Sequence, residues 1–294
     1  MKIIYSLFFI SIFLSCKAQK APILTKNNDG NTLLWEVSGN GLKVPTYLFG
    51  TFHMLCKSDI VFSPQLQQAL AYSKQVYFEM DLDDPKNTLG AVFFMNMKNS
   101  TLKDLYTVKE YQKVKSYFKD TLGMGLELLQ KWKPSLLEAM LYPRMMPCKN
   151  ASGVELELMD IAVKQKKEIL GLETIEFQTS VFDSIPYQIQ ANALLKTIDS
   201  IAAYKVYFEK MVQVYKNQQI EKLQEIISDT TFSEGLNNDI MLKNRNQNWV
   251  IQLQKIMPLN NVFVAVGAAH LFGKDGLIKL FLSKGYTVTP LMNK

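Results

Sequence analysis

The stretch NVFVAVGAAHLFGKDGLIKLFLSKGYTVTP, residues 261–290, indicates the fold of this chain. Its first part, 261–266, is an apolar, valine-rich run typical of a buried strand. A helix is expected over 275–284, Gly285 suits the position after its last turn, and 286–290 predicts another strand. This strand–helix–strand spacing indicates a βαβ unit and therefore the α/β class.

Upstream of this unit, apolar runs bounded by turn residues predict further strands. The runs at 33–37 and 46–49 indicate a hairpin, and the runs at 75–80 and 169–173 indicate two more strands. Helical patterns fill the intervals, over 64–72, 88–147, 152–167, 187–227 and 237–257. We therefore expect an α/β fold with a central mixed β-sheet, flanking helices and two helical insertions.

The N-terminus predicts an export signal. Lys2 precedes an apolar segment at 3–14 that is too short for a permanent membrane anchor. The segment runs into Cys16 in a sequence that resembles a lipoprotein cleavage box, so we expect Cys16 to be lipidated and the protein to face the periplasm as a membrane-anchored lipoprotein. Cleavage after Ala18 would instead leave a soluble periplasmic protein. The expected segments are a signal peptide at 1–16, a tether at 17–31 and a folded domain at 32–294.

Composition excludes several classes of protein. Apolar residues make up 48% of the chain and charged residues 20%, which is typical of a globular domain rather than a disordered tail or a coiled coil. The net charge of +6 comes with scattered lysines, so we expect no nucleic-acid partner. Two cysteines remain after Cys16. Cys56 and Cys148 can form a disulfide, Cys56 can bind a metal beside His53, or both can be small buried side chains, which is the interpretation we favour.

The chain has two histidines, and both occur in Gly-x-x-His turns. Gly50 to His53 follows one predicted strand, and Gly267 to His270 follows another. Ligands of open α/β sheets bind at the carboxyl ends of strands, and glycine permits a sharp turn or a close approach of the backbone. His53 and His270 are therefore expected to mark the functional site together.

Carboxylates occur at the ends of two other predicted strands. Glu79 lies near the end of the first and Glu173 ends the second. Two imidazoles and two carboxylates make the ligand set of a divalent-metal site, or the groups of general acid–base catalysis. Asp81 points to the same side as Glu79 by strand alternation and is expected to support it in a second shell around the site. Arg245 can hold a substrate carboxylate or a developing negative charge.

Other catalytic signatures are absent from the sequence, including Gly-x-Ser-x-Gly, His-Glu-x-x-His, Walker A and Gly-x-Gly-x-x-Gly. The ordered motifs instead resemble those of the TraB/GumN (PrgY) family, over about 33–291. These motifs are LFGTFH at 48–53, YFEMD at 77–81, GLETIEFQ at 171–178, Arg245-Asn246 with Trp249, and VGAAHLFG at 266–273.

That family is similar to the Tiki proteins, membrane-tethered metalloproteases that cleave peptide ligands and prefer manganese or cobalt, and it is related to erythromycin esterases. The resemblance implies an erythromycin esterase/Tiki-like fold, with a TraB/GumN-like hydrolase domain over 32–294. It also implies a divalent metal, manganese or cobalt, with zinc as a further option. The implied metal ligands are His53, His270, Glu79 and Glu173, and the implied catalytic residues are Glu79, Glu173 and Arg245. Glu155 replaces the aspartate of many relatives and keeps the acid.

Three functions fit these features. The first is an exported, metal-dependent hydrolase of the peptidase type, in which the unligated glutamate is the general base and Arg245 stabilises negative charge. The second is a metal-free, esterase-like hydrolase in which His53 activates water. The third is a protein that sequesters peptides without cleaving them, since some family members are linked with silencing peptide signals. The expected partners are a peptide or small molecule and, through the lipid, a membrane.

Overall fold

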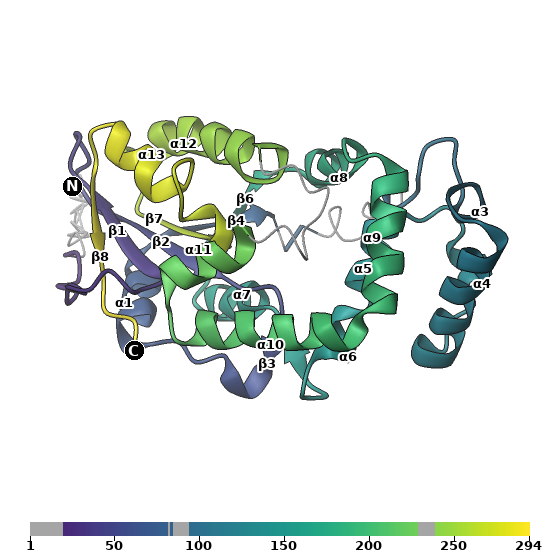
Figure 1. Cartoon of the computed structure of the whole chain (residues 1–294). Helices are drawn as coiled ribbons and strands as arrows, with labels where there is room; N and C mark the ends of the chain where they lie inside the picture. The colour runs from purple at the N-terminus through teal and green to yellow at the C-terminus, as the bar shows by residue number, and fades with distance from the viewer. Residues whose placement is uncertain (1–19, 82, 85–93, 229–238) are drawn as a thin grey trace, which may run out of the picture.

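A computed structural model of the chain describes residues 20–81, 83–84, 94–228 and 239–294 (Figure 1). The expected signal peptide with Cys16 lies outside these residues, as do 88–93 and 237–238 of two expected helical segments. In the described part of the chain, no helix is both long and apolar enough to cross a membrane.

A six-stranded mixed sheet, in the order β6-β4-β7-β2-β1-β8, confirms the expected fold class. Its strands are β1 (Leu34–Ser38), β2 (Thr46–Thr51), β4 (Gln75–Met80), β6 (Glu168–Glu173), β7 (Val262–Gly267) and β8 (Thr287–Pro290). β1 and β2 form the expected antiparallel hairpin, and β2, β7, β4 and β6 are parallel neighbours. β8 pairs with β1 rather than with β7, so the predicted strand–helix–strand unit crosses over two intervening strands.

The alternation of side chains along β7 explains why helices cover both faces of the sheet. Its three valines belong to an apolar cluster with Trp249, whereas Phe263 and Ala265 belong to a second cluster with Leu66. The helices on the two faces are α12 (Asn244–Ile256) and α13 (Leu277–Ser283), above the sheet in Figure 1, and α1 (Pro64–Tyr72) and α7 (Val154–Lys164), below it. The central strands are therefore buried on both sides.

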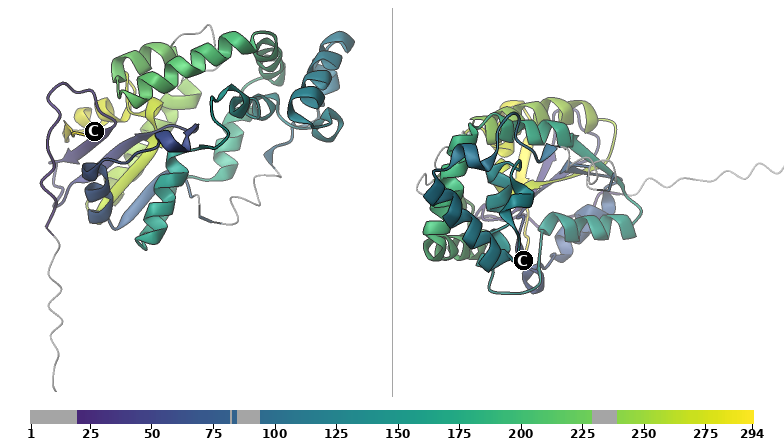
Figure 2. Two further views of the ribbon diagram at one scale, coloured as in Figure 1. Left: turned by 90° about the horizontal axis from the view of Figure 1, so that it is seen from below. Right: turned by 90° about the vertical axis from the view of Figure 1, so that its right-hand side faces the viewer.

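Both expected insertions are helical, and they pack together. The first contains α3 (Leu102–Leu105), α4 (Val108–Tyr117), α5 (Pro134–Ala139) and α6 (Tyr142–Met145); the second contains α8 (Ile175–Asp183), α9 (Tyr187–Asp199), α10 (Ile201–Lys216) and α11 (Ile220–Ser228) before α12. Helices α3, α4 and α5 contact α9, and α6 contacts α10. Figures 1 and 2 show α3, α4, α5 and α9 as a group to one side of the sheet.

The helical pattern over 187–227 is confirmed, and the segment divides into α9, α10 and α11. The break after α10 is explained by Gln218, which adopts a positive φ of 55°. Its buried side chain accepts a hydrogen bond from the backbone N–H of Leu33 and donates one to the carbonyl of Asn293. These contacts with distant segments override the local helical preference.

The described part of the expected tether, 20–31, contacts the domain from Leu24 onward, where the Leu24 side chain packs against the core. Lys26 forms a β-bridge with Leu291. The backbone N–H of Asn27 donates to the carbonyl of Pro290 at 2.9 Å, and that of Met292 donates to the carbonyl of Thr25 at 2.8 Å. This part of the chain therefore lies along the end of β8.

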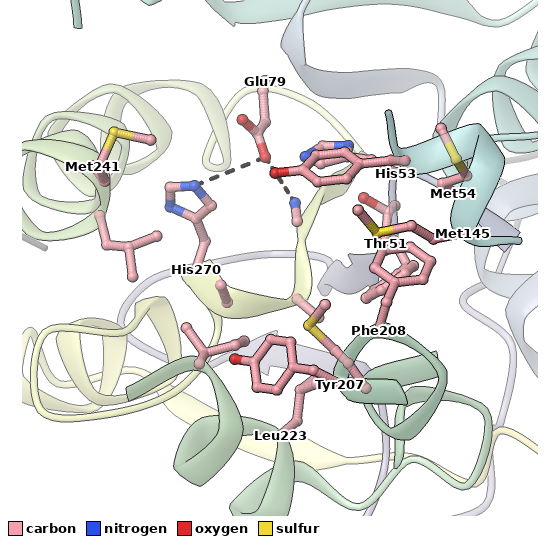
Figure 3. A pocket seen from close by; sticks show the side chains of 18 of the residues that line it. Thr51, His53, Met54, Glu79, Met145, Tyr207, Phe208, Leu223, Met241 and His270 are labelled. Carbon is pink, nitrogen blue, oxygen red and sulfur yellow. Dashed lines mark hydrogen bonds and ion pairs between the residues drawn. The ribbon is translucent and has the colours of Figure 1, made fainter. Parts of the chain in front are cut away.

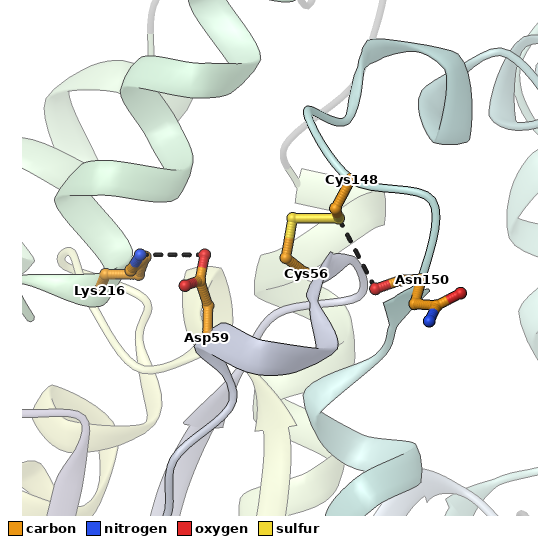
Figure 4. Close-up of a disulfide and its surroundings, with 5 residues drawn as sticks. All are labelled: Cys56, Asp59, Cys148, Asn150 and Lys216. Atoms are coloured by element: carbon orange, nitrogen blue, oxygen red, sulfur yellow. Dashed lines mark hydrogen bonds and ion pairs between the residues drawn. A yellow bond between two sulfur atoms is a disulfide. The ribbon is translucent and has the colours of Figure 1, made fainter.

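Cys56 and Cys148 form a disulfide, so the favoured interpretation of two separate buried thiols is wrong (Figure 4). Their Cα atoms are 5.9 Å apart, and 92 positions separate them in sequence. The bond lies beside a two-stranded sheet of β3 (Leu55–Cys56) and β5 (Ala151–Ser152). Because the sulfur of Cys56 is bonded to Cys148, it is excluded as a metal ligand.

Candidate active site

The two Gly-x-x-His turns lie side by side because β2 and β7 are parallel neighbours in the sheet. Their register pairs Thr51 with Gly267, so the two turns leave the same edge of the sheet with a one-residue offset. Gly50 is required for this packing: a Cβ there would lie 2.9 Å from Leu271 Cδ1 and 3.1 Å from Ala268 Cα. The expected meeting of both turns at one strand edge is therefore observed.

His270 is buried and held in one tautomer. It lies in the short turn η5 (Ala268–His270), with 5% of its side chain exposed. The Asn246 amide nitrogen donates to the carbonyls of His270 and Asp275, so the Asn246 oxygen accepts from His270 Nδ1–H at 2.6 Å. Burial lowers the pKa of His270 to about 3. At neutral pH its imidazole is thus uncharged, and its Nε2 carries a lone pair.

His53 is exposed, in contrast to His270, with 73% of its side-chain surface accessible. Its Nδ1 lies 2.7 Å from Oε1 of Glu155, at the start of α7. The hydrogen bond to Glu155 raises the pKa of His53 to about 9, and the negative charges of Glu155 and Glu79 act in the same direction. Glu155 therefore orients the imidazole and leaves Nε2 directed away from the pair.

Glu79 lies at the carboxyl end of β4, between the two histidines (Figure 3). Its Oε1 accepts from the backbone N–H of Gly267 at 2.8 Å and lies 3.8 Å from His270 Nε2, while its Oε2 accepts from Arg245 and Gln178. Burial alone would raise the pKa of Glu79, but protonated His270, Arg245 and the Gly267 N–H lower it to about 2. His270 is neutral at pH 7, so Arg245 and then protonated His53 are the charges that keep the pKa of Glu79 low there.

Arg245 and Glu173 form a buried ion pair behind Glu79. The Nε and Nη2 of Arg245 donate to the Glu173 carboxylate at 2.8–3.1 Å, and Nη2 also donates to Glu79 at 2.7 Å. Trp249 donates its indole N–H to Glu173 Oε1 at 2.9 Å, and its ring lies 4.9 Å from the guanidinium carbon. Both oxygens of Glu173 are therefore engaged, and this glutamate holds Arg245 in place.

Asp81 lies at the end of β4, beside Asp83. Its carboxyl group interacts with the side chain of Asp83, and burial together with that hydrogen bond raises the pKa of Asp81. Gln178 of α8 and Arg245 are side chains that donate to Glu79, and a supporting role for Asp81 stays a prediction.

The structure adds three polar residues to the site. Glu155, Asn246 and Gln178 hold His53, His270 and Glu79, respectively. Each lies within or beside a motif of the sequence, but none has a local pattern that identifies its partner. Only the fold brings each of them to a site residue that is distant in sequence.

A divalent metal fits the donor chemistry of the site, because an oxygen atom holds Nδ1 of each histidine and Nε2 lies on the other side of each ring. A Cβ on Gly267 would lie 3.1 Å from Glu79 Oε1 and 3.8 Å from His53 Nε2, so glycine leaves a small space between these donors. In the described residues, however, no group of three or more histidine, cysteine, aspartate or glutamate side chains is arranged to hold an ion. Arg245 Nη1 also lies 3.2 Å from His270 Nε2 and would have to move away.

These groups lie at one end of a cavity of about 400 Å³ (Figure 3). Thr51, His53, Glu79, Arg245 and His270 line the polar end, and the remaining walls are mainly methionine, aromatic and aliphatic side chains. The arrangement offers two imidazoles, an ionised carboxylate and a guanidinium beside an apolar space.

Comparison with known proteins gives a family match over most of the chain. The profile of the TraB/PrgY/gumN family matches residues 33–290. A protein named "Metalloprotease TIKI1" from Danio rerio is 24% identical over 324 residues, which cover 90% of this chain and 64% of that protein. The proteins named "Uncharacterized protein YbaP" from Escherichia coli strain K12 and Shigella flexneri are each 29% identical over 125 residues, or 42% of this chain and 46% of theirs.

The chain thus spans less than two thirds of the length of these relatives. No solved structure matches it significantly.

Proposed function

This chain belongs to the TraB/PrgY/gumN family, and from the chemistry of its site we propose that it is a hydrolase that cleaves peptide bonds with a bound divalent metal. The observation that carries the proposal is the pair of histidines with fixed Nδ1 atoms on either side of Glu79. The similarity to a protein named as a metalloprotease supports it.

We propose that His53, His270 and Glu79 hold the metal, since Gly267 leaves a space open between these side chains. When bound, the ion polarises a carbonyl and lowers the pKa of water. Manganese and cobalt are the first metals to test, and zinc is the third. Glu173 is not needed as a ligand in this proposal, because Arg245 and Trp249 engage both of its oxygens.

The side chains around the ligands have separate roles in the proposed reaction. Glu155 and Asn246 orient the two imidazoles, and such partners typically contribute about 10- to 100-fold to metal affinity or activity. Arg245 keeps its charge at any working pH and, facing Glu79, stabilises negative charge that develops on the substrate. Glu173 positions Arg245 for this role.

The test combines metal analysis with a peptide library. The full chain is purified without chelator, its metal content is measured by elemental mass spectrometry, and cleavage is followed by mass spectrometry with Mn²⁺, Co²⁺, Zn²⁺ or EDTA. We expect cleavage that EDTA abolishes and a metal restores, and that His53→Ala and His270→Ala abolish while the fold is retained. Full activity of both variants would contradict the proposal, as would peptide binding without cleavage under every metal, which would favour sequestration.

A metal-free hydrolase is the second candidate, and the contact between Arg245 Nη1 and His270 Nε2 favours it, because it occupies the lone pair that a metal would need. In that case His53, oriented by Glu155, activates water as a general base. The raised pKa of His53 means that this activity would increase as the pH approaches about 9. Activity that resists EDTA and follows that pH profile would support this candidate over the first.

We also propose export, with Cys16 as a lipidated residue at the membrane. The disulfide supports this proposal, since such bonds persist mainly in oxidising compartments. Cell fractionation and labelling with a radioactive fatty acid test it, with Cys16→Ser as the comparison. Recovery of unlabelled protein from the cytoplasm would contradict it, whereas an unlabelled periplasmic protein would indicate cleavage after Ala18.

A further inference from the structure

The cavity beside the histidines is sharply divided into a polar end and an apolar remainder. Among its described lining residues, all charged and imidazole side chains are those of the candidate active site. The rest of the lining includes methionines at 54, 145, 211 and 241. A charged substrate side chain in the apolar part would therefore lose its hydration without gaining an opposite charge.

Helix α10 supplies most of one wall, through a single face. Tyr204, Tyr207, Phe208 and Met211 all line the cavity, at the spacing of residues that share one side of a helix. Further along the same helix, the hydroxyl group of Tyr215 donates to the carbonyl of Gly50 at 2.9 Å. This bond fixes the helix against the first Gly-x-x-His turn, and so fixes the wall relative to His53.

Aromatic contacts join this wall to the reactive end. Phe52 precedes His53 in sequence, and its ring centroid lies 5.9 Å from that of Phe208. Phe208 in turn stacks on Tyr142 of α6, with centroids 6.1 Å apart and 13° between the ring planes. The apolar surface is thus continuous with the place where a scissile bond would lie.

We infer that the face of α10 selects substrates with a large apolar side chain, such as leucine, methionine or phenylalanine, next to the bond that is cleaved. That these ligands are substrates rests on the proposed function, whereas the preference in binding does not depend on cleavage. Met211 lies in the wall as a partly buried, flexible side chain that can adapt to several apolar shapes. Met211 is therefore assigned as a residue that determines specificity.

The test measures binding separately from cleavage. Peptides of the form fluorophore-Ala-Ala-X-Ala-Ala-NH2 are titrated with EDTA-treated full-length protein, and binding is followed by fluorescence anisotropy. With X as leucine, methionine or phenylalanine, we expect binding at least about 10-fold tighter than with aspartate or lysine, since apolar pockets discriminate by roughly 10- to 200-fold. Equal affinities for apolar and charged X would overturn the inference.

Two variants on α10 locate the selective surface. Met211→Lys places a charge in the wall and is expected to weaken binding of the leucine peptide at least about 10-fold. Val206→Lys is the matched control, because Val206 is 67% exposed on the same helix and does not line the cavity. The affinity of this variant for the leucine peptide should equal that of the unchanged protein. Equal losses in both variants, or none in Met211→Lys, would overturn the inference.

A third variant covers the case in which Met211→Lys does not fold, as judged by circular dichroism. Met211→Ala widens the wall without adding charge, and it should shift the preference from leucine toward phenylalanine and tryptophan. An unchanged order of affinities would again overturn the inference. If the peptides bind as expected but none is cleaved with any metal, the proposed hydrolase function fails while the selective surface stands.

Discussion

Removal of the disulfide is expected to destabilise the protein by a large part of its folding free energy. Cys56 and Cys148 lie 92 positions apart, so the bond closes a long loop in the unfolded chain. In the chain-entropy treatment, a disulfide that closes a loop of this size stabilises the folded protein by about 4 to 5 kcal/mol, because it restricts the unfolded chain. For a domain of this size, that loss corresponds to a fall in melting temperature on the order of 10 °C.

The bond also lies close to the site in sequence on both sides. Cys56 follows His53 by three residues, and Cys148 precedes Glu155 by seven. The short pairing of β3 with β5 and the hydrogen bond from Val154 N–H to the Phe52 carbonyl, at 2.9 Å, join the same two segments. We therefore expect the loss of the disulfide to loosen the His53–Glu155 contact as well as the fold.

The assay is equilibrium unfolding in urea, followed by circular dichroism, of the double variant Cys56→Ala/Cys148→Ala. Val206→Ala is the control, because it is also a substitution by alanine, lies at an exposed position and leaves both cysteines in place. The double variant should lose about 4 to 5 kcal/mol and the control should not change. A loss below about 1 kcal/mol in the double variant, or an equal loss in the control, would refute the reasoning.

Three further predictions concern the polar site. In metal-free protein, nuclear magnetic resonance should show one histidine with a pKa near 9 (His53) and one that stays uncharged down to about pH 3 (His270). Because folding raises the pKa of His53 from 6.5, its ion pair with Glu155 stabilises the fold fully below pH 6.5, and this stabilisation is lost as the pH rises through about 9. Two ordinary histidine pKa values would contradict this prediction. Glu155→Gln should return His53 toward its ordinary pKa and weaken Mn²⁺ binding about 10- to 100-fold by calorimetry, with unchanged affinity as the contrary result. Arg245→Leu should cost about 3 to 5 kcal/mol in urea unfolding, because it leaves two buried carboxylates without a cation, and a near-neutral effect would show that the pair is dispensable.

The sequence predicts the parts of this fold whose signals are local. Each central strand is an apolar run that ends at a turn residue, so its position follows from a few neighbouring residues. The placement of both Gly-x-x-His turns at one edge follows as well, because parallel strands end on the same side. The α/β class and the meeting of His53, Glu79 and His270 can therefore be inferred from the amino-acid sequence alone.

Contacts between distant segments are the part that the sequence does not predict. β8 has the pattern of a neighbour of β7 but pairs with β1, because alternation identifies a buried strand and not its partner. Glu173 has the position of a ligand, yet Arg245, 72 residues away, engages it. Helix α10 ends before Gln218, because the side chain of Gln218 forms hydrogen bonds with the distant residues Leu33 and Asn293.

The anchoring of α10 has an evolutionary consequence. The histidines, Glu79 and Gly267 belong to the sheet edge, whereas the selective face belongs to one helix that Tyr215 fastens to Gly50. Mutations within 204–211 that keep Phe208, which packs against Phe52 of the first turn, can therefore accumulate without disturbing the turns that carry the chemistry. Exchanging this short segment between family members should transfer their preferences, so new specificities can arise by replacing a module rather than by rebuilding the catalyst.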